Sequence, residues 1–437
     1  MRDIVFFLFF LPFVYLAFRV PFLGICAWIW TVLLVPKNML FGFAADLRFT
    51  YILAIVTIIS LVINRDPFLR KPGGTLYVLM LLFLLQSSIS NMFSIGIPVL
   101  GWAVWSDFFK AMMLVTFILM MLNTRNRIET FIKLMLVGAG FNIVFEALKF
   151  LVTVGSYRIP GILNSMLTDN NLFALGVLML LPLFIYITPT LKTKNLRLAF
   201  LGFSGLCAVC VIGTFSRGGF IGLLIVGWRL LQKSKKKILF GFIGIVFASG
   251  AIFVAADGWK DRMETIDDAK SDASFLGRTT AWKIATLVAL DRPLIGGGQD
   301  SVQTFQVWDY YYREIDKLDF LGLANAYRNR PKAAHSIYFQ VLGDAGIPGI
   351  LLFLGILFTG YRMSKRLSKH AHQDWIRGLA SAINTMLLAY MVSGALLSMA
   401  YYDVLYAMLA VLICIDRLNK QDIENLTRFT SPDKDNN

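Results

Sequence analysis

The sequence of 437 residues has few charged residues and few of the side chains that form metal sites or disulfides. Only 16% of its residues are charged, and it contains three histidines and four cysteines. The cysteines all stand within apolar runs, which indicates packing roles and not a disulfide framework. With so few imidazole and thiol groups in polar surroundings, a metal site built from histidine and cysteine is not expected.

The sequence is rich in long hydrophobic runs. Hydrophobic residues make up 57% of the chain and its mean hydropathy is +0.66, values too high for a soluble domain. Several apolar runs approach or exceed the length of about 20 residues that a helix needs to cross a bilayer. None alternates in the way that the strands of outer-membrane barrels do. The sequence therefore predicts an all-α polytopic membrane protein with about 12 transmembrane helices.

The basic residues indicate which loops face the cytoplasm. The net charge is +15, and Lys and Arg gather in short loops that alternate with loops holding very few. Such basic loops normally stay on the cytoplasmic side. This orientation places three regions outside, namely the loop from Tyr157 to Asn170, the turn at Ser216 and Arg217, and residues 257–334.

The same pattern divides the chain into parts. The first two apolar runs, Ile4 to Phe18 and Pro21 to Leu34, are short for full crossings, so we expect one bent span or a shallow hairpin. In the outer segment, Arg278 to Leu290 and Val302 to Ile315 are predicted amphipathic helices on either side of a turn from Arg292 to Gly298. The predicted parts are an N-terminal transmembrane bundle (1–256), the outer helical segment (257–334), C-terminal transmembrane helices (335–416) and a cytoplasmic tail (417–437).

Three outward-facing features could carry chemistry. Arg217 lies at the outer boundary between two spans, where an arginine snorkels, pairs or binds an anion, or simply caps a tight hairpin. Arg278 opens a predicted helix against the macrodipole, which an anionic ligand or a surface ion pair would explain. His335 stands where the outer segment re-enters the membrane. It could abstract a proton or bind a diphosphate, or be only an amphipathic anchor.

Two further elements are weaker candidates. The stretch from Thr168 to Asn171 precedes a span and could be a simple helix cap. Gly296, Gly297 and Gly298 could cradle a phosphate, but a turn is favoured because no Walker lysine is present. No Asp-x-Asp pair occurs in the outer region, so metal-assisted sugar-nucleotide chemistry has no support, and catalysis would rest on the arginines.

In order and spacing, these features resemble the shared core of bacterial O-antigen ligases, O-antigen polymerases and protein O-oligosaccharyltransferases. The resemblance covers roughly Ser165 to Gly360. In one respect the sequence departs from the family pattern, since Asn170 replaces the proline of an Asp-Pro-Asn element. The matching stretches are Ser216-Arg217-Gly218, Gly277-Arg278 with Trp282, Pro293 to Gly298, His335 to Tyr338, and Gly343 to Gly349.

The resemblance implies a transferase of the GT-C-type glycosyltransferase architecture in the bacterial inner membrane, with its active site on the periplasmic side. The implied donor is a glycan on undecaprenyl diphosphate and the implied acceptor is the lipid A core. Membrane lipids are the other partners. No metal, cofactor or nucleic acid is expected. Arg217 and Arg278 would hold the diphosphate, and His335 would activate the acceptor hydroxyl or contact phosphate. Asp169, Asn171 and Tyr338 would bind substrate.

Several alternatives remain at the level of sequence. A polymerase that extends a lipid-linked glycan and an oligosaccharyltransferase that modifies exported proteins share the implied chemistry. A transporter of an anionic lipid would also place arginines along a route through about 12 spans. A non-catalytic scaffold would tolerate replacement of the arginines.

Overall fold

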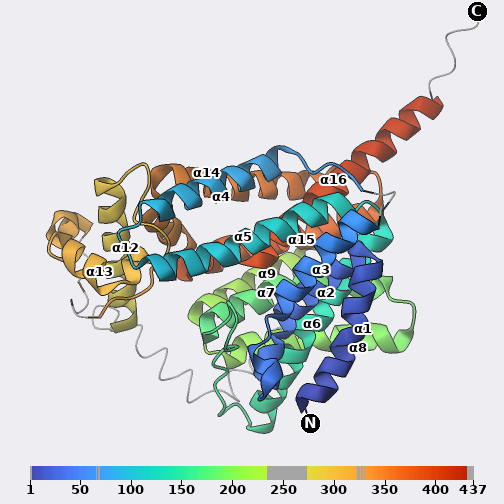
Figure 1. The fold of residues 1–437 in the computed structure, drawn as a ribbon, viewed down its shortest axis with the longest axis horizontal. Coiled ribbons are helices and arrows are strands. Elements are labelled where there is room, and N and C mark those ends of the chain that lie inside the picture. The colour runs from blue at the N-terminus through green and yellow to red at the C-terminus, as the bar shows by residue number, and fades with distance from the viewer. Residues whose placement is uncertain are drawn as a thin grey trace, which may run out of the picture.

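A computed structural model describes residues 2–64, 66, 69–233, 273–321, 325, 328 and 330–430. This part of the chain is helical (Figure 1). Short 3-10 helices η1 (Pro36–Met39), η2 (Phe43–Asp46), η3 (Thr188–Thr190), η4 (Ser301–Gln303), η5 (Ile315–Leu321) and η6 (Gly394–Leu396) connect the longer ones. The α-helices are α1 (Arg2–Arg19), α2 (Pro21–Leu34), α3 (Phe49–Ile63), α4 (Thr75–Met92), α5 (Pro98–Met121), α6 (Arg125–Val152), α7 (Asn170–Ile187), α8 (Lys194–Gly213), α9 (Arg217–Lys233), α12 (Ala273–Asp291), α13 (Phe305–Tyr312), α14 (Ile337–His370), α15 (Asp374–Ser393) and α16 (Asp403–Thr430).

Seven helices in the described part of the chain are long and apolar enough to cross a membrane: α4, α5, α6, α7, α8, α14 and α15. The number of about 12 expected from the sequence is not confirmed within these residues. The helices α2 and α3 are apolar but short, and the apolar run from Ile238 to Ala256 lies outside the described residues. Many large apolar side chains on the outer surface, such as Val62, Val99 and Phe145, are exposed. A multi-pass membrane protein is the arrangement that these helices indicate.

The first two helices are separate and pack against each other. Val20 between them has an extended backbone, and Pro21 starts α2. Of the two expectations for this region, the hairpin describes the packing and the single bent span does not. Nearly every residue of α2 is buried, because α1, α3 and α6 all pack against it.

The outer segment forms a small core of its own around Trp308, with Ile284 and Val288 of α12 and Val307 of α13. The helix predicted from Arg278 to Leu290 is confirmed as part of α12. The second predicted helix is divided, because Thr304 separates η4 from α13. Residues 257–272 lie outside the described part of the chain.

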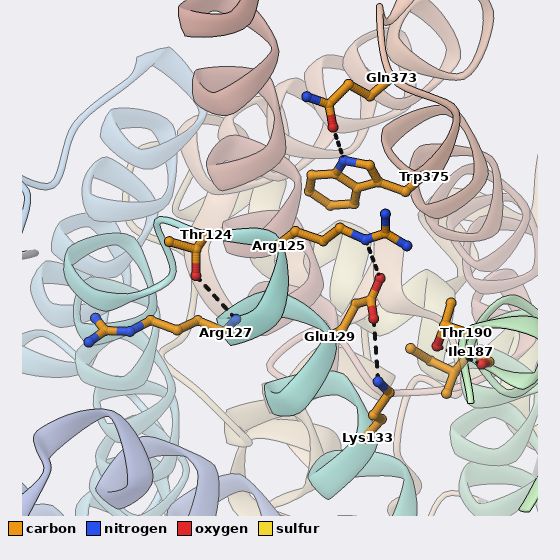
Figure 2. Close-up of polar contacts among 9 residues, drawn as sticks. All are labelled: Thr124, Arg125, Arg127, Glu129, Lys133, Ile187, Thr190, Gln373 and Trp375. Carbon is orange, nitrogen blue, oxygen red and sulfur yellow. Dashed lines mark hydrogen bonds and ion pairs between the residues drawn. The ribbon is translucent and has the colours of Figure 1, made fainter. Parts of the chain in front are cut away.

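Two of the basic loops that were assigned to one side of the membrane, those before α6 and α15, lie together. Arg125 at the start of α6 pairs with Glu129 at 2.7 Å, and its guanidinium group lies over the ring of Trp375 at the start of α15 (Figure 2). Lys133 contacts the other oxygen of Glu129 at 3.3 Å. Because α15 has 20 residues, these contacts and the end of α15 are about 30 Å apart along its axis.

The last helix continues beyond the apolar run. It passes through Asp416, which pairs with Arg366 and with Lys420, and ends at Thr430. In Figure 1 its final turns extend away from the rest of the molecule. The boundary expected at residue 416 thus lies inside a helix, and residues 431–437 are outside the described part.

Candidate active site

The element that contains Asp169 lies against the turn before α9. Asp169 caps α7, since its carboxylate accepts hydrogen bonds from the backbone N–H groups of Asn171 at 2.7 Å and Leu172 at 2.9 Å. The Ser216 hydroxyl donates to the side-chain oxygen of Asn171 at 2.7 Å. These contacts hold the starts of α7 and α9 together, although the two motifs are 45 residues apart in sequence.

The residue that departs from the family pattern has a contact that proline could not make. The side-chain amide of Asn170 donates to the carbonyl of Thr214 at 2.9 Å. Asn170 occupies the first position of α7, where proline is also well suited because its missing N–H would have no helical partner. The replacement therefore preserves the helix start and adds a bond to the neighbouring turn.

Small residues let the start of α9 approach its neighbours closely. An added Cβ at Gly219 would come within 2.7 Å of Ala174 on α7, and one at Gly222 within 2.2 Å of the Ser393 hydroxyl on α15. Gly218 lies beside Leu396 of η6. Phe215, in the turn, has a φ of +52°, an uncommon conformation for a residue with a side chain. Arg217 is thus positioned at the junction of α7, α9 and the end of α15.

The end of α15 also contacts the start of α14, the helix that follows His335. A Cβ at Gly394 would meet the side chain of Ile337 at 2.8 Å, and the Tyr338 hydroxyl donates to the carbonyl of Met391 at 2.9 Å. The helices α7, α9 and α14 therefore all begin in one region. Each presents the positive end of its dipole there, a setting that favours an anion. The hydroxyl of Tyr338 is used in packing, and its role in substrate binding stays a prediction.

His335 has an unusual backbone and a fixed position. Its φ is +43°, in the left-handed region. The preceding carbonyl, that of Ala334, accepts a hydrogen bond from the indole of Trp282 at 2.6 Å, and the Trp282 ring stacks on Phe339 with centroids 5.0 Å apart. Trp282 of α12 therefore holds both sides of the turn that contains His335. A strained conformation that the surroundings maintain is a common property of functional sites.

The charges around His335 include two of the other predicted residues. Burial lowers the pKa of His335 below its ordinary value, and the positive charges of Arg278 and Lys332 lower it further. The carboxylate of Asp169 acts in the opposite direction. An imidazole with a lowered pKa is neutral at pH 7, so it can accept a proton. Arg278 and Asp169 thus lie close enough to His335 to act on its charge.

The glycine-rich motif has a structural role. Gly297 and Gly298 donate their backbone N–H groups to the carbonyls of Gly343 and Asp344 at 2.8 and 2.9 Å. Gly346, at the kink of α14, has a φ of +66° and a ψ of −164°, and a Cβ there would lie 2.6 Å from the carbonyl oxygen of Pro293. The two N–H groups are occupied by the protein, which agrees with a turn and not with a phosphate cradle.

Sequence analysis overlooked two residues that the structure places at this region. Ser216 is buried and joins α7 to α9, but it was considered only as a neighbour of Arg217. Lys332 packs over Gly277 and acts on the pKa of His335. Its position three residues before His335 was the only available signal. Among the described residues, no group of three or more His, Cys, Asp or Glu side chains could hold a metal ion.

Comparison with known families divides the chain near the start of α8. Residues 1–191 match a family of unknown function (DUF5935), and residues 202–354 match the O-antigen ligase family. We refer to residues 202–354 as the O-antigen ligase domain, after the family that they match. The match supports membership of the chain in the O-antigen ligase superfamily. No curated protein matches the chain. Arg217, Arg278 and His335 fall in the O-antigen ligase domain, whereas Asp169 and Asn171 fall in the segment of unknown function.

Proposed function

We propose that the chain is an O-antigen ligase of the bacterial inner membrane, acting in lipopolysaccharide biosynthesis. It transfers the polysaccharide of an undecaprenyl-diphosphate donor to a sugar hydroxyl of the lipid A core on the periplasmic side. The observation that carries the proposal is the setting of His335, a lowered-pKa imidazole within electrostatic range of Arg278 and Asp169. The O-antigen ligase domain around it supports the same reading.

Arg217 and Arg278 are proposed to bind the diphosphate. A guanidinium group forms two parallel hydrogen bonds to phosphate and keeps its charge at every relevant pH. Arg217 begins α9, so the N-terminal end of that helix adds positive potential to the side chain. The setting suits a leaving group that gains negative charge as its bond to the sugar breaks. Preorganised donors of this kind stabilise such a transition state by about 3 kcal/mol each.

His335 is proposed to accept the proton of the acceptor hydroxyl. The hydroxyl oxygen then attacks the anomeric carbon of the donor and forms the new glycosidic bond. The bond between that carbon and the diphosphate oxygen breaks, and undecaprenyl diphosphate leaves with the electron pair. Attack on the face opposite the leaving group inverts the anomeric centre. The role of Asp169 is to cap α7 and to offset part of the positive charge near His335.

A product assay with purified protein in detergent tests this function. The donor is an undecaprenyl-diphosphate-linked polysaccharide, offered with rough lipopolysaccharide, with a second lipid-linked glycan, or with a periplasmic protein. We expect transfer to rough lipopolysaccharide. Transfer only to the lipid-linked glycan would indicate a polymerase, and transfer only to protein an oligosaccharyltransferase. Because detergent removes any gradient, product formation would also exclude transport as the primary activity.

A further inference from the structure

A polar cavity in the described part of the chain lies next to the candidate active site and is not used in the mechanism above. Its volume is about 810 Å³, within the range of ligand-binding pockets. It is lined by the end of α2, the loop that follows it, the start of α3, the first half of α5, the loop around Ser165 and the turn before α16. Apart from Tyr402 and Asp403, every lining residue falls in the segment of unknown function.

The cavity and the candidate active site share two walls. Leu167, two residues before the capping residue Asp169, lines the cavity and packs on Gly176 of α7. On the other side, a Cβ added at Gly176 would lie 3.4 Å from the Tyr402 hydroxyl, and the backbone N–H of Ala400 donates to the side chain of Gln340 near the start of α14. A ligand held in the cavity would therefore lie beside the helix starts that surround His335.

The lining carries hydrogen-bonding atoms that the protein does not use. The Tyr402 hydroxyl and one carboxylate oxygen of Asp403 are buried without a hydrogen-bond partner among the described residues. Buried polar atoms of this kind are normally satisfied, so they indicate a polar ligand. Tyr51 also lines the cavity, and two cations lie over its ring. Lys110 Nζ is 4.7 Å and Arg48 Cζ is 5.5 Å from the ring centroid.

The balance of charge identifies the ligand class. Three basic side chains of the lining, those of Lys37, Arg48 and Lys110, are matched by three acidic ones, those of Asp46, Asp107 and Asp403. A site for a phosphate would have an excess of cations over carboxylates. Carboxylates that accept, cations that donate and an aromatic face together suit a ligand with many hydroxyl groups.

We propose that this cavity binds the neutral sugar units of the acceptor, so that the segment of unknown function selects the acceptor while the O-antigen ligase domain binds the donor. This inference rests on the proposed function. Asp403 and Tyr402 accept or donate hydrogen bonds to sugar hydroxyls, and Arg48 contacts the sugar at the cavity rim. The wall at Leu167, two residues before Asp169, is the side of the cavity that leads to the candidate active site.

The test measures transfer kinetics of the full-length protein with rough lipopolysaccharide as the acceptor. Asp403→Asn is expected to raise the acceptor KM about tenfold, while the donor KM changes by less than about twofold, because the carboxyl group that bonds the sugar hydroxyl is replaced by an amide. Arg48→Gln, which alters an exposed side chain and does not threaten folding, is expected to change the same parameter. Asp374→Asn is the matched control, since Asp374 is also an acid in the first turn of a helix but is exposed far from the cavity.

A competition arm separates the ligand classes. A deacylated and dephosphorylated core oligosaccharide is expected to inhibit competitively against the acceptor, and inorganic phosphate is not. Inhibition against the acceptor by phosphate alone would overturn the assignment of the cavity to sugar. If Asp403→Asn and Arg48→Gln both transfer as well as the unmodified protein, with an unchanged acceptor KM, this assignment is also overturned, but the proposed function stands. Wild-type protein without transfer to any acceptor would instead refute the proposed function.

Discussion

Ser216 and Asn171 are joined by a hydrogen bond of 2.7 Å between the serine hydroxyl and the side-chain oxygen of the asparagine. Ser216 immediately precedes Arg217, and Asn171 follows the capping residue Asp169. The same serine hydroxyl accepts the backbone N–H of Gly219 at 3.1 Å. One side chain thus closes the first turn of α9 and connects it to the start of α7.

Ser216→Ala is expected to lower kcat about tenfold and to destabilise the protein by about 1 kcal/mol, because both bonds are lost and Arg217 is held less firmly. Steady-state kinetics and thermal unfolding in detergent measure the two effects. Ser368→Ala is the control, since the hydroxyl of Ser368 bonds only within an exposed part of α14. Unchanged kinetics and stability in Ser216→Ala would show that the bond does not position Arg217.

Arg217→Ala and Arg278→Ala are each expected to reduce kcat by roughly 10²-fold to 10³-fold. The double variant Arg217→Lys with Arg278→Lys keeps both charges but loses the paired hydrogen bonds, so it is expected to be nearly inactive. Transfer assays on protein of confirmed membrane insertion give the result. Arg313→Ala, at an exposed arginine of the outer segment, is expected to be silent. Near-normal product from the double lysine variant would argue against bidentate recognition of phosphate.

The acidic limb of the pH profile is expected to lie below pH 6.5, because burial and the nearby cations lower the pKa of His335 from that ordinary value. Lys332→Gln removes one of these cations, so the pKa of His335 rises and the limb moves to higher pH. Asp169→Asn removes an anion and moves it to lower pH. Profiles of kcat/KM for the three proteins check the signs. A limb that stays in place in both variants would exclude His335 as the titrating group.

Gly346→Ala is expected to prevent stable folding. The φ and ψ of Gly346 lie in a region open only to glycine, and the added Cβ would meet the backbone of the Pro293 turn. The cost exceeds about 3 kcal/mol. Gly355→Ala in the same helix is the control, because its Cβ would have only an ordinary contact with Leu79. Comparable yield and melting temperature of the two variants in detergent would contradict this reading.

Much of the helical content could be predicted from the sequence, because apolar length is a local property. The hairpin of α1 and α2, the helix around Trp282 and the turn from Arg292 to Gly298 all follow from local signals. The expected number of about 12 spans is not confirmed within the described residues, since α2 and α3 are short and some helices carry charged residues within their length. One example is α16, which carries Asp416 and Arg417 in the middle of its length.

The candidate site was only partly predictable. The three outward motifs could be identified one by one, and the positive-inside pattern placed them on one side. Their mutual contacts depend on tertiary packing that periodicity does not encode. The bond between Trp282 and Ala334, the approach of Lys332 to His335 and the cavity beside Tyr402 are all of this kind.

The bond from Asn170 to Thr214 crosses from the segment of unknown function into the O-antigen ligase domain. The neighbouring bond from Ser216 to Asn171 crosses the same border and depends on both side chains. A hybrid whose first half lacked Asn170 and Asn171 would lose both bonds, and the helix start that carries Arg217 would lose its anchors. The two halves are expected to descend together through their lineage, and a swap of acceptor specificity between relatives would have to exchange the Thr214–Ser216 turn with the first half.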